Sequence, residues 1–190
     1  MDKLGADFFN TVRDIEEKLG AKPAIMALPI GQESSFKGVV LLLEQKALIW
    51  ESDEDGSKYN EQDVPKDMEA LVVEYRQKLV EKIAETDDAI LERYLQGKEI
   101  AVLELKQALR RATIAYKLVP IFCGSSLRNK GVQPLLDAVV EYLPSPADVE
   151  PAKGTNPKSQ TEEVRRRDPA EPFAALAFKI QADPHVGKLT

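Results

Sequence analysis

Hydrophobic residues recur at intervals of three and four in five stretches of the chain, and each stretch predicts an amphipathic helix with one buried side. Asp7 can cap the first helix and Gly20 ends it. Thr86 and Asp87 mark a break between the second and third helices. The apolar stripes are Phe8, Val12, Ile15 and Leu19; Met68, Val72, Tyr75, Leu79 and Ile83; Ile90, Leu91, Tyr94 and Leu95; Val102, Leu105, Leu109 and Ala112; and Val132, Leu135, Leu136, Val139 and Leu143.

Short apolar runs without this spacing predict strands. A polar turn at 52–57 follows the third run and is typical of a hairpin tip. Residues 145–172 have no periodicity and are rich in proline, charge and small polar residues, which predicts an interdomain linker. The predicted strands are residues 23–28, 36–43, 46–50, 118–122 and 173–180. Strands mixed with helices in this order predict an α/β fold.

Composition narrows the class of protein. The chain has 190 residues, 43% of them hydrophobic, which suffices for one ordinary core or two small ones. A net charge of −6 excludes a global basic field that would attract nucleic acid or membrane, although Arg165, Arg166 and Arg167 form a local basic run. Cys123 is the single cysteine, so the chain has no internal disulfide and suits a reducing compartment. No apolar run approaches the roughly 20 residues of a membrane span, and we expect a cytoplasmic protein.

The stretch from Leu118 to Gly131 has the order strand, polar loop, helix. In α/β proteins this arrangement presents backbone N–H groups to a ligand at the carboxyl end of a strand. The loop contains Gly124-Ser125-Ser126. Taken alone, such a loop is more typical of a plain turn. A ligand loop and a turn therefore remain alternatives on this pattern alone.

Several motifs occur together in a characteristic order. They are Met-Asp-Lys-Leu-Gly-Ala-Asp-Phe at 1–8, Gly-Ser-Ser-Leu at 124–127, Asn-Lys-Gly-Val-Gln at 129–133 and Leu-Leu-Asp-Ala-Val-Val-Glu-Tyr-Leu-Pro-Ser-Pro at 135–146. The chain thereby resembles bacterial elongation factor G, the ribosomal translocation GTPase, over essentially all of its length. Met1 and Asp2 match the end of that family's Asn-Lys-Met-Asp motif, and 124–127 match its second guanine motif.

The resemblance implies the C-terminal part of a P-loop GTPase domain, with a parallel sheet and helices, that carries an inserted α+β subdomain and is followed by the first strand of a β-barrel domain. Both ends then look cut, and we expect an internal fragment. The implied parts are a helix after the guanine motif (1–19), the insertion (20–116), the final GTPase strand, loop and helix (117–144), a linker (145–172) and the barrel strand (173–190).

The resemblance also implies a guanine site formed by Asp2, Ser125, Ser126 and Leu127. A carboxylate only accepts hydrogen bonds, and guanine offers N1–H and N2–H side by side, so Asp2 can bind both. The Ser126 N–H would donate to guanine O6, and Ser125 would orient the Asp2 carboxylate. Ser126 stands where the family usually has alanine, which leaves the backbone donor in place. Taken alone, Asp2 is better explained as an N-terminal helix cap.

The implied ligand is GTP or GDP, with Mg²⁺ only in a full-length protein. The chain contains no Gly-x-x-x-x-Gly-Lys-Ser/Thr motif to hold the phosphates. No residue can be assigned to catalysis or to metal coordination, which is where phosphoryl-transfer chemistry resides. We therefore expect the parent protein to hydrolyse GTP and this chain alone to be inactive.

An acidic row formed by Glu74, Glu81, Glu85 and Asp88 lies opposite an apolar helix stripe. Such rows usually mark a solvated helix face. The resemblance implies instead that Glu81, Glu85 and Asp88 face the ribosome and meet the basic C-terminal domain of the stalk protein. Two alternatives remain open: a paralogue such as a ribosomal protection or elongation factor G-like protein, and a stand-alone module that binds the ribosomal stalk.

Overall fold

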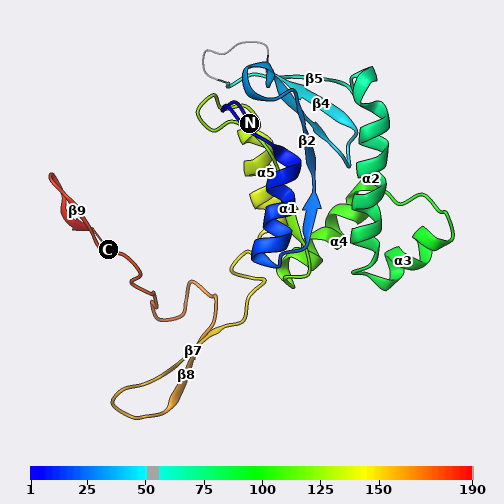
Figure 1. The fold of residues 1–190 in the computed structure, drawn as a ribbon. Coiled ribbons are helices and arrows are strands. Elements are labelled where there is room, and N and C mark those ends of the chain that lie inside the picture. The colour runs from blue at the N-terminus through cyan, green and yellow to red at the C-terminus, as the bar shows by residue number, and fades with distance from the viewer. Residues whose placement is uncertain (51–55, 190) are drawn as a thin grey trace. The chain divides into compact units, whose positions relative to one another are not determined.

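The computed structural model describes residues 1–50 and 56–189 and divides into two compact units, Met1–Leu143 and Pro144–Thr190 (Figure 1). The turn predicted at 52–57 falls mostly outside the described residues. Among the described residues, no helix is both long enough and apolar enough to cross a membrane.

An antiparallel sheet lies at the centre of the first unit. Its strands follow the order β2 (Ala27–Ile30), β3 (Gly38–Leu41), β4 (Lys46–Ile49) and β5 (Asn60–Asp63). The two middle strands are buried on both faces: Val40 packs in the main core, whereas its neighbour Val39 packs in a second cluster with Leu48 and Trp50. Burial on both faces explains why these strands are continuous apolar runs rather than alternating ones.

A second sheet of the first unit has two parallel strands, β1 (Pro23–Ile25) and β6 (Val119–Ile121). The prediction of one strand over 23–28 is therefore corrected: Met26 separates β1 from β2, which belong to different sheets. The Met26 N–H donates to the carbonyl of Ile121 at 2.9 Å, and its carbonyl accepts from Leu42. Met26 thus joins the two sheets through its backbone.

Five helices are present in the described part of the chain: α1 (Phe8–Leu19), α2 (Glu69–Ala84), α3 (Asp88–Leu95), α4 (Val102–Ile114) and α5 (Val132–Tyr142). Two short 3-10 turns, Glu33–Ser35 and Lys66–Met68, precede β3 and α2. The predicted helix ends are confirmed where caps were expected. The Asp7 carboxylate accepts from the Asn10 N–H at 2.9 Å, and Gly20 ends α1 at φ +62°.

The predicted buried stripe of α5 is wrong. The helix buries Pro134, Ala138 and Tyr142, which recur every four residues, and it leaves the predicted stripe exposed. The main contact of α5 with another helix is with α4, and the covered side faces α4 and the core. The exposed members are Leu135, Leu136, Val139 and Leu143, with exposures of 44–59%.

The second unit contains two hairpins, β7 (Ala152–Thr155) with β8 (Glu162–Arg165), and β9 (Gln181–Asp183) with β10 (Gly187–Leu189). The first lies inside the predicted linker, 145–172, which is therefore not wholly irregular. The strand predicted at 173–180 is not formed, and Phe173 and Phe178 are almost fully exposed. An apolar run needs a paired neighbour to become a strand, and the described unit supplies none there. Its place in a barrel domain stays a prediction.

The fold class is confirmed at the level of a mixed α/β protein.

Candidate functional site

The first residues of the chain lie against the loop that follows β6. The Met1 amino group donates to the Gly124 carbonyl at 2.7 Å, across 123 positions of sequence. The Ser125 hydroxyl hydrogen-bonds to the Asp2 carboxylate and holds the pKa of Asp2 below its usual value. The Asp2 side chain is 13% exposed, and its Oδ2 lies 3.8 Å from Nε of Arg128. The structure thus brings Asp2 and Ser125 together.

The loop itself is a tight turn closed by its two buried ends. Ser125 and Lys130 exchange backbone hydrogen bonds of 2.8 and 3.0 Å. The Arg128 N–H donates to Ser125 Oγ at 3.3 Å, so this hydroxyl serves both the loop and Asp2. Gly131 leaves the loop at φ +82°, where a Cβ would lie 2.8 Å from the Cys123 carbonyl oxygen. A side chain at Gly131 would therefore displace the loop from the end of β6.

Ser126 and Leu127 form the outer side of this turn. Both are exposed, Leu127 by 76%. Within the described residues, neither of their backbone N–H groups donates a hydrogen bond. Two donors therefore remain available close in sequence to the Asp2–Ser125 pair. A carboxylate acceptor beside free N–H donors can bind a planar group that presents donors and an acceptor along one edge.

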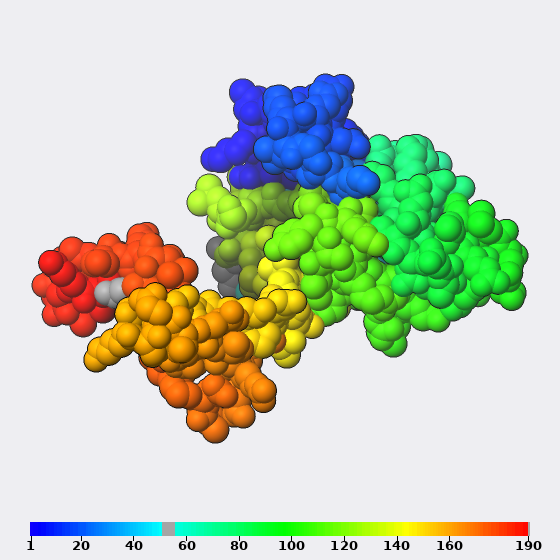
Figure 2. Space-filling view, turned by 90° about the horizontal axis from the view of Figure 1, so that it is seen from below, coloured from blue at the N-terminus to red at the C-terminus, as the bar shows by residue number. Residues whose placement is uncertain are grey.

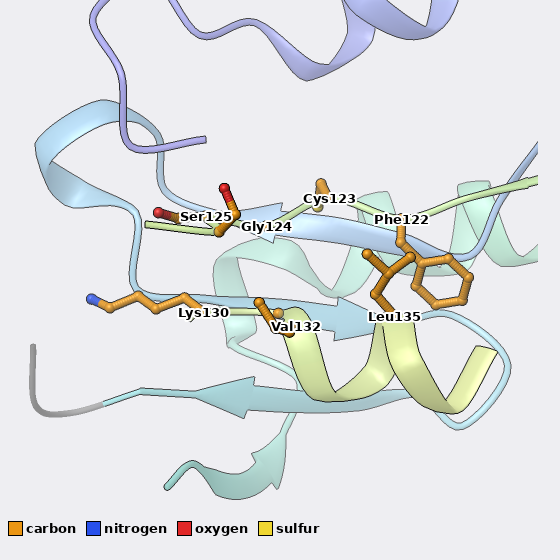
Figure 3. A pocket seen from close by; sticks show the side chains of 9 residues that line it. Phe122, Cys123, Gly124, Ser125, Lys130, Val132 and Leu135 are labelled. Atoms are coloured by element: carbon orange, nitrogen blue, oxygen red, sulfur yellow. The ribbon is translucent and has the colours of Figure 1, made fainter. Parts of the chain in front are cut away.

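A cavity of about 230 Å³ lies under the same loop (Figure 3). Phe122 and Leu135 form its apolar end, whereas the Lys130 side chain extends away from them. The lining comes from the two residues that follow β6, from the loop and from the start of α5, and Asp2 does not contribute to it. The cavity and the Asp2 carboxylate are therefore separate features of the loop.

Two residues beside the site were missed in the sequence. Lys130 is 5% exposed, and its Nζ donates to the Phe36 carbonyl at 3.5 Å. Glu33 accepts from the Gly5 N–H at 2.7 Å and donates its own N–H to the Met1 carbonyl at 2.9 Å. Neither residue belongs to a periodic pattern, so the sequence carried no signal for these contacts. Burial raises the pKa of the nearby Cys123 thiol to about 12, which makes this cysteine a poor nucleophile.

The acidic row lies on a different surface of the first unit. Glu81, Glu85 and Asp88 are all exposed, and among the described residues their carboxylates have no hydrogen-bond or ion-pair partner. Glu74, in contrast, pairs with Lys78. In Figure 2 the atoms of α2 and α3, coloured from blue-green to green, form one end of this unit.

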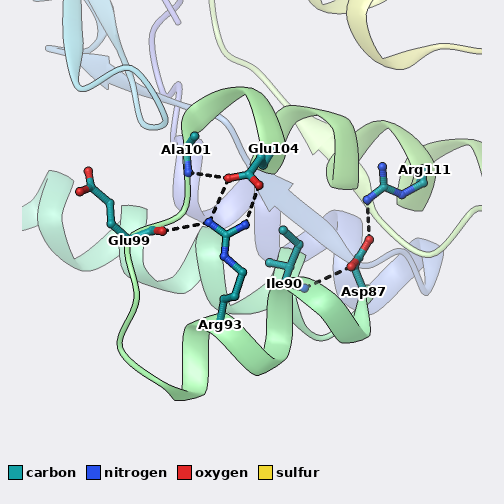
Figure 4. A network of polar contacts seen from close by, with 7 residues as sticks. All are labelled: Asp87, Ile90, Arg93, Glu99, Ala101, Glu104 and Arg111. Carbon is teal, nitrogen blue, oxygen red and sulfur yellow. Dashed lines mark hydrogen bonds and ion pairs between the residues drawn. The ribbon is translucent and has the colours of Figure 1, made fainter.

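Polar contacts fix the corner between α2 and α3 on which this row depends (Figure 4). Asp87 caps α3 by accepting from the Ile90 N–H at 3.2 Å and also pairs with Arg111 of α4. Arg93 of α3 forms a forked contact with Glu104 of α4. The two contacts tie both ends of α3 to α4 and thereby hold the corner between α2 and α3.

The fold and the candidate site define a class: a mixed α/β protein with a strand–loop–helix element whose loop contacts the first residues of the chain. No family model matches the chain. A crystal structure of the Thermus thermophilus protein ttk003000868 is similar, with a TM-score of 0.71 and 28% sequence identity over 97% of this chain. The match covers 24% of that protein, so this chain spans about a quarter of its length.

Proposed function

We propose that the first unit carries the base-recognition part of a guanine-nucleotide-binding protein of the elongation factor G type. The observation that supports this most is the contact between the Asp2 carboxylate and the Ser125 loop. The residues come from two motifs that are separated by more than 120 positions. A plain turn and a plain helix cap, the alternatives for each motif alone, give no reason for the two to meet.

The hydrogen-bond inventory of the base explains the residue types. Ionised Asp2 accepts from N1–H and N2–H of guanine, and the exposed Ser126 N–H donates to O6. Adenine lacks this donor pair, and a bidentate contact of this kind separates two bases by about 1–3 kcal/mol. Ser125 acts on Asp2 rather than on the base, because its hydroxyl already bonds the carboxylate.

In this proposal the ligand is GTP or GDP, and the parent protein uses it to drive ribosomal translocation. Phosphate contacts, Mg²⁺ binding and hydrolysis are assigned to residues outside this sequence, which has no phosphate-binding Gly-x-x-x-x-Gly-Lys motif. The chain by itself is then a base-binding piece without GTPase activity. A paralogue with the same recognition loop fits these observations as well.

Guanosine titration of the ¹⁵N-labelled chain tests the proposal. Guanosine should shift the amide signals of Ser126 and Leu127, inosine should do so less because it lacks the 2-amino group, and adenosine should not. Asp2→Asn should abolish the preference for guanosine over inosine. Asp14→Asn, an exposed carboxylate on α1, is the matched control and should leave it unchanged. Equal shifts from adenosine and guanosine would refute base recognition.

We propose a second role for the acidic corner, because Glu81, Glu85 and Asp88 are exposed and unpaired within the described chain. They suit a basic partner, and the ribosomal stalk C-terminal domain is the one that the family resemblance suggests. Charge complementarity of this kind accelerates encounter and weakens with salt. Glu81→Lys with Glu85→Lys should abolish binding of the labelled stalk domain at low salt. Glu16→Lys with Glu17→Lys on α1 makes the same change in net charge and should not abolish it.

A further inference from the structure

One end of the antiparallel sheet contacts both segments of the proposed base site, which are the start of the chain with Asp2 and the loop with Ser125. Residues 31–37 join β2 to β3, and the connection that contains Gly56 joins β4 to β5. Because neighbouring strands run in opposite directions, these two connections lie at the same end of the sheet (Figure 1). The start of the chain and the Ser125 loop meet at this end.

The first connection holds the segment that carries Asp2. The Glu33 N–H donates to the Met1 carbonyl at 2.9 Å, and the Glu33 carboxylate accepts from the Gly5 N–H at 2.7 Å. The two bonds lie on either side of Asp2 in the sequence. Glu33 adopts φ +52°, a left-handed conformation that is uncommon for a residue with a side chain. The chain accepts this strain at the position that fixes Asp2.

The second connection holds the Ser125 loop. The Gly56 carbonyl accepts from two side chains, Nε1 of Trp50 at 3.0 Å and Nε2 of Gln133 at 2.8 Å. Gln133 lies in the first turn of α5, directly after the loop. Gly56 is buried against the loop, and a Cβ there would collide with the Arg128 carbonyl and lie 2.6 Å from Asn129 Cβ.

Apolar packing joins the same parts. The cluster on the second face of the sheet contains Val39, Leu48 and Trp50. Met1 and Cys123, which flank the two segments of the base site, pack against this cluster. Hydrogen bonds and side-chain packing therefore connect the sheet end to both segments. Neither these hydrogen bonds nor this packing involves the Asp2 carboxylate or the Ser126 N–H, the groups assigned to guanine.

We propose that the sheet end, made of Glu33, Trp50 and Gly56 together with Gln133, sets the spacing between Asp2 and the Ser125 loop and thereby tunes affinity for the base. Glu33 and Gln133 are positioning residues. They act through Asp2 and through the loop and do not touch the ligand. The proposal rests on the proposed function in that its ligand is the guanine base. It adds that binding at the base site changes the sheet end, and that a change at the sheet end alters binding. Trp50 lies where the two meet, because its indole N–H donates to the Gly56 carbonyl.

Gln133→Met tests positioning apart from stability. Methionine keeps the volume and the helix propensity and removes the donor to Gly56. It also removes Gln133 Oε1, a buried acceptor with no partner among the described residues, so the melting temperature should change little. The lost bond should weaken guanosine binding by about three- to tenfold. Glu33→Gly, which removes the carboxylate and relieves the strain, should weaken it similarly. Gln77→Met on the exposed side of α2 is the matched control.

Trp50 provides a spectroscopic signature, because it is the only tryptophan and its indole N–H gives one resolved signal. Guanosine should shift this signal in the unmodified chain, and Gln133→Met should shift it without ligand, whereas Gln77→Met should not. Unchanged guanosine affinity in both Gln133→Met and Glu33→Gly overturns the positioning role. If guanosine does not bind the unmodified chain, the proposed function fails instead. In that case hydrogen exchange of the Ser125 and Lys130 backbone amides tests whether Gln133 positions the loop. Faster exchange in Gln133→Met than in the unmodified chain supports the positioning role, and unchanged exchange overturns it.

Discussion

Gly56→Ala separates backbone strain from steric overlap at the contact between sheet and loop. Gly56 has φ +63°, and Gly20 at the end of α1 has φ +62°, so a side chain meets the same conformational penalty at both positions. A Cβ at Gly20 meets nothing within 4 Å, whereas at Gly56 it collides with the loop. Gly20→Ala is therefore a control that carries the strain alone.

The expected magnitudes follow from these contacts. The left-handed conformation costs an alanine about 1–2 kcal/mol, partly offset by about 0.4–1 kcal/mol from the stiffer unfolded chain. Gly20→Ala should therefore lower the free energy of unfolding by about 1 kcal/mol. At Gly56 the Cβ would lie 2.6 Å from Asn129 Cβ, well inside ordinary contact, so the loop must move. Overpacking of this kind adds about 1–3 kcal/mol.

Urea unfolding followed by circular dichroism measures both variants without relying on Trp50, which contacts Gly56. We expect the transition midpoint of Gly56→Ala to fall clearly below that of Gly20→Ala, with similar slopes. Exchange at the Ser125 amide should also accelerate only in Gly56→Ala. If both variants lose the same free energy, the loop does not press on Gly56 and the steric reasoning is refuted.

Three further predictions concern titratable groups. Because its folded pKa lies below the ordinary value of 3.8, Asp2 should keep guanosine binding intact as pH falls from 7 to 4, with loss only below that, as followed by amide shifts. The pKa of Asp87 is also lowered, chiefly by its hydrogen bond with Arg111, so the ionised carboxylate stabilises the fold at pH 7. Asp87→Ala should lower the free energy of unfolding by about 1–2 kcal/mol at pH 7, and by less as pH falls through the folded pKa. Asp87→Asn, which keeps the helix cap, should lower the melting temperature less than Asp87→Ala does. The Cys123 thiol, with its pKa raised to about 12, should resist iodoacetamide at pH 8 in the folded chain and react in urea; rapid alkylation of the folded chain would contradict its burial.

Local patterns predicted the helices well and their surroundings less well. The cap at Asp7, the helix break at Thr86 and Asp87 and the stripe on α2 depend on neighbouring residues, so the sequence contains the whole signal. The strand run at 23–28 could not show that Met26 changes sheets, because that choice is made by Ile121 and Leu42, far away in the sequence. The buried side of α5 was predicted wrongly because an apolar stripe shows what a helix can bury, not what covers it.

The candidate site divides in the same way. Asp2 and Ser125 were found because their motifs resemble those of a known family, and the structure places them together. Glu33, Lys130 and Gln133 were not assigned roles, since their partners are backbone carbonyls or N–H groups of distant segments. Contacts to the backbone leave no trace in residue type at the partner position. Such positioning contacts are found only in three dimensions.

The core bears on how the first unit is organised. Its main cluster joins Phe8 and Val12 of α1, residues of β1 to β3, and side chains of α2, α4 and α5. Segments on both sides of the predicted insertion, 20–116, therefore share one core, and β1 within that range pairs with β6 outside it. Removing 20–116 would expose Phe8, Ala138 and Tyr142 and delete the sheet end that holds Asp2 and the Ser125 loop. The proposed base site thus depends on residues that a simple insertion would leave dispensable, because Glu33, Trp50 and Gly56 all lie within 20–116.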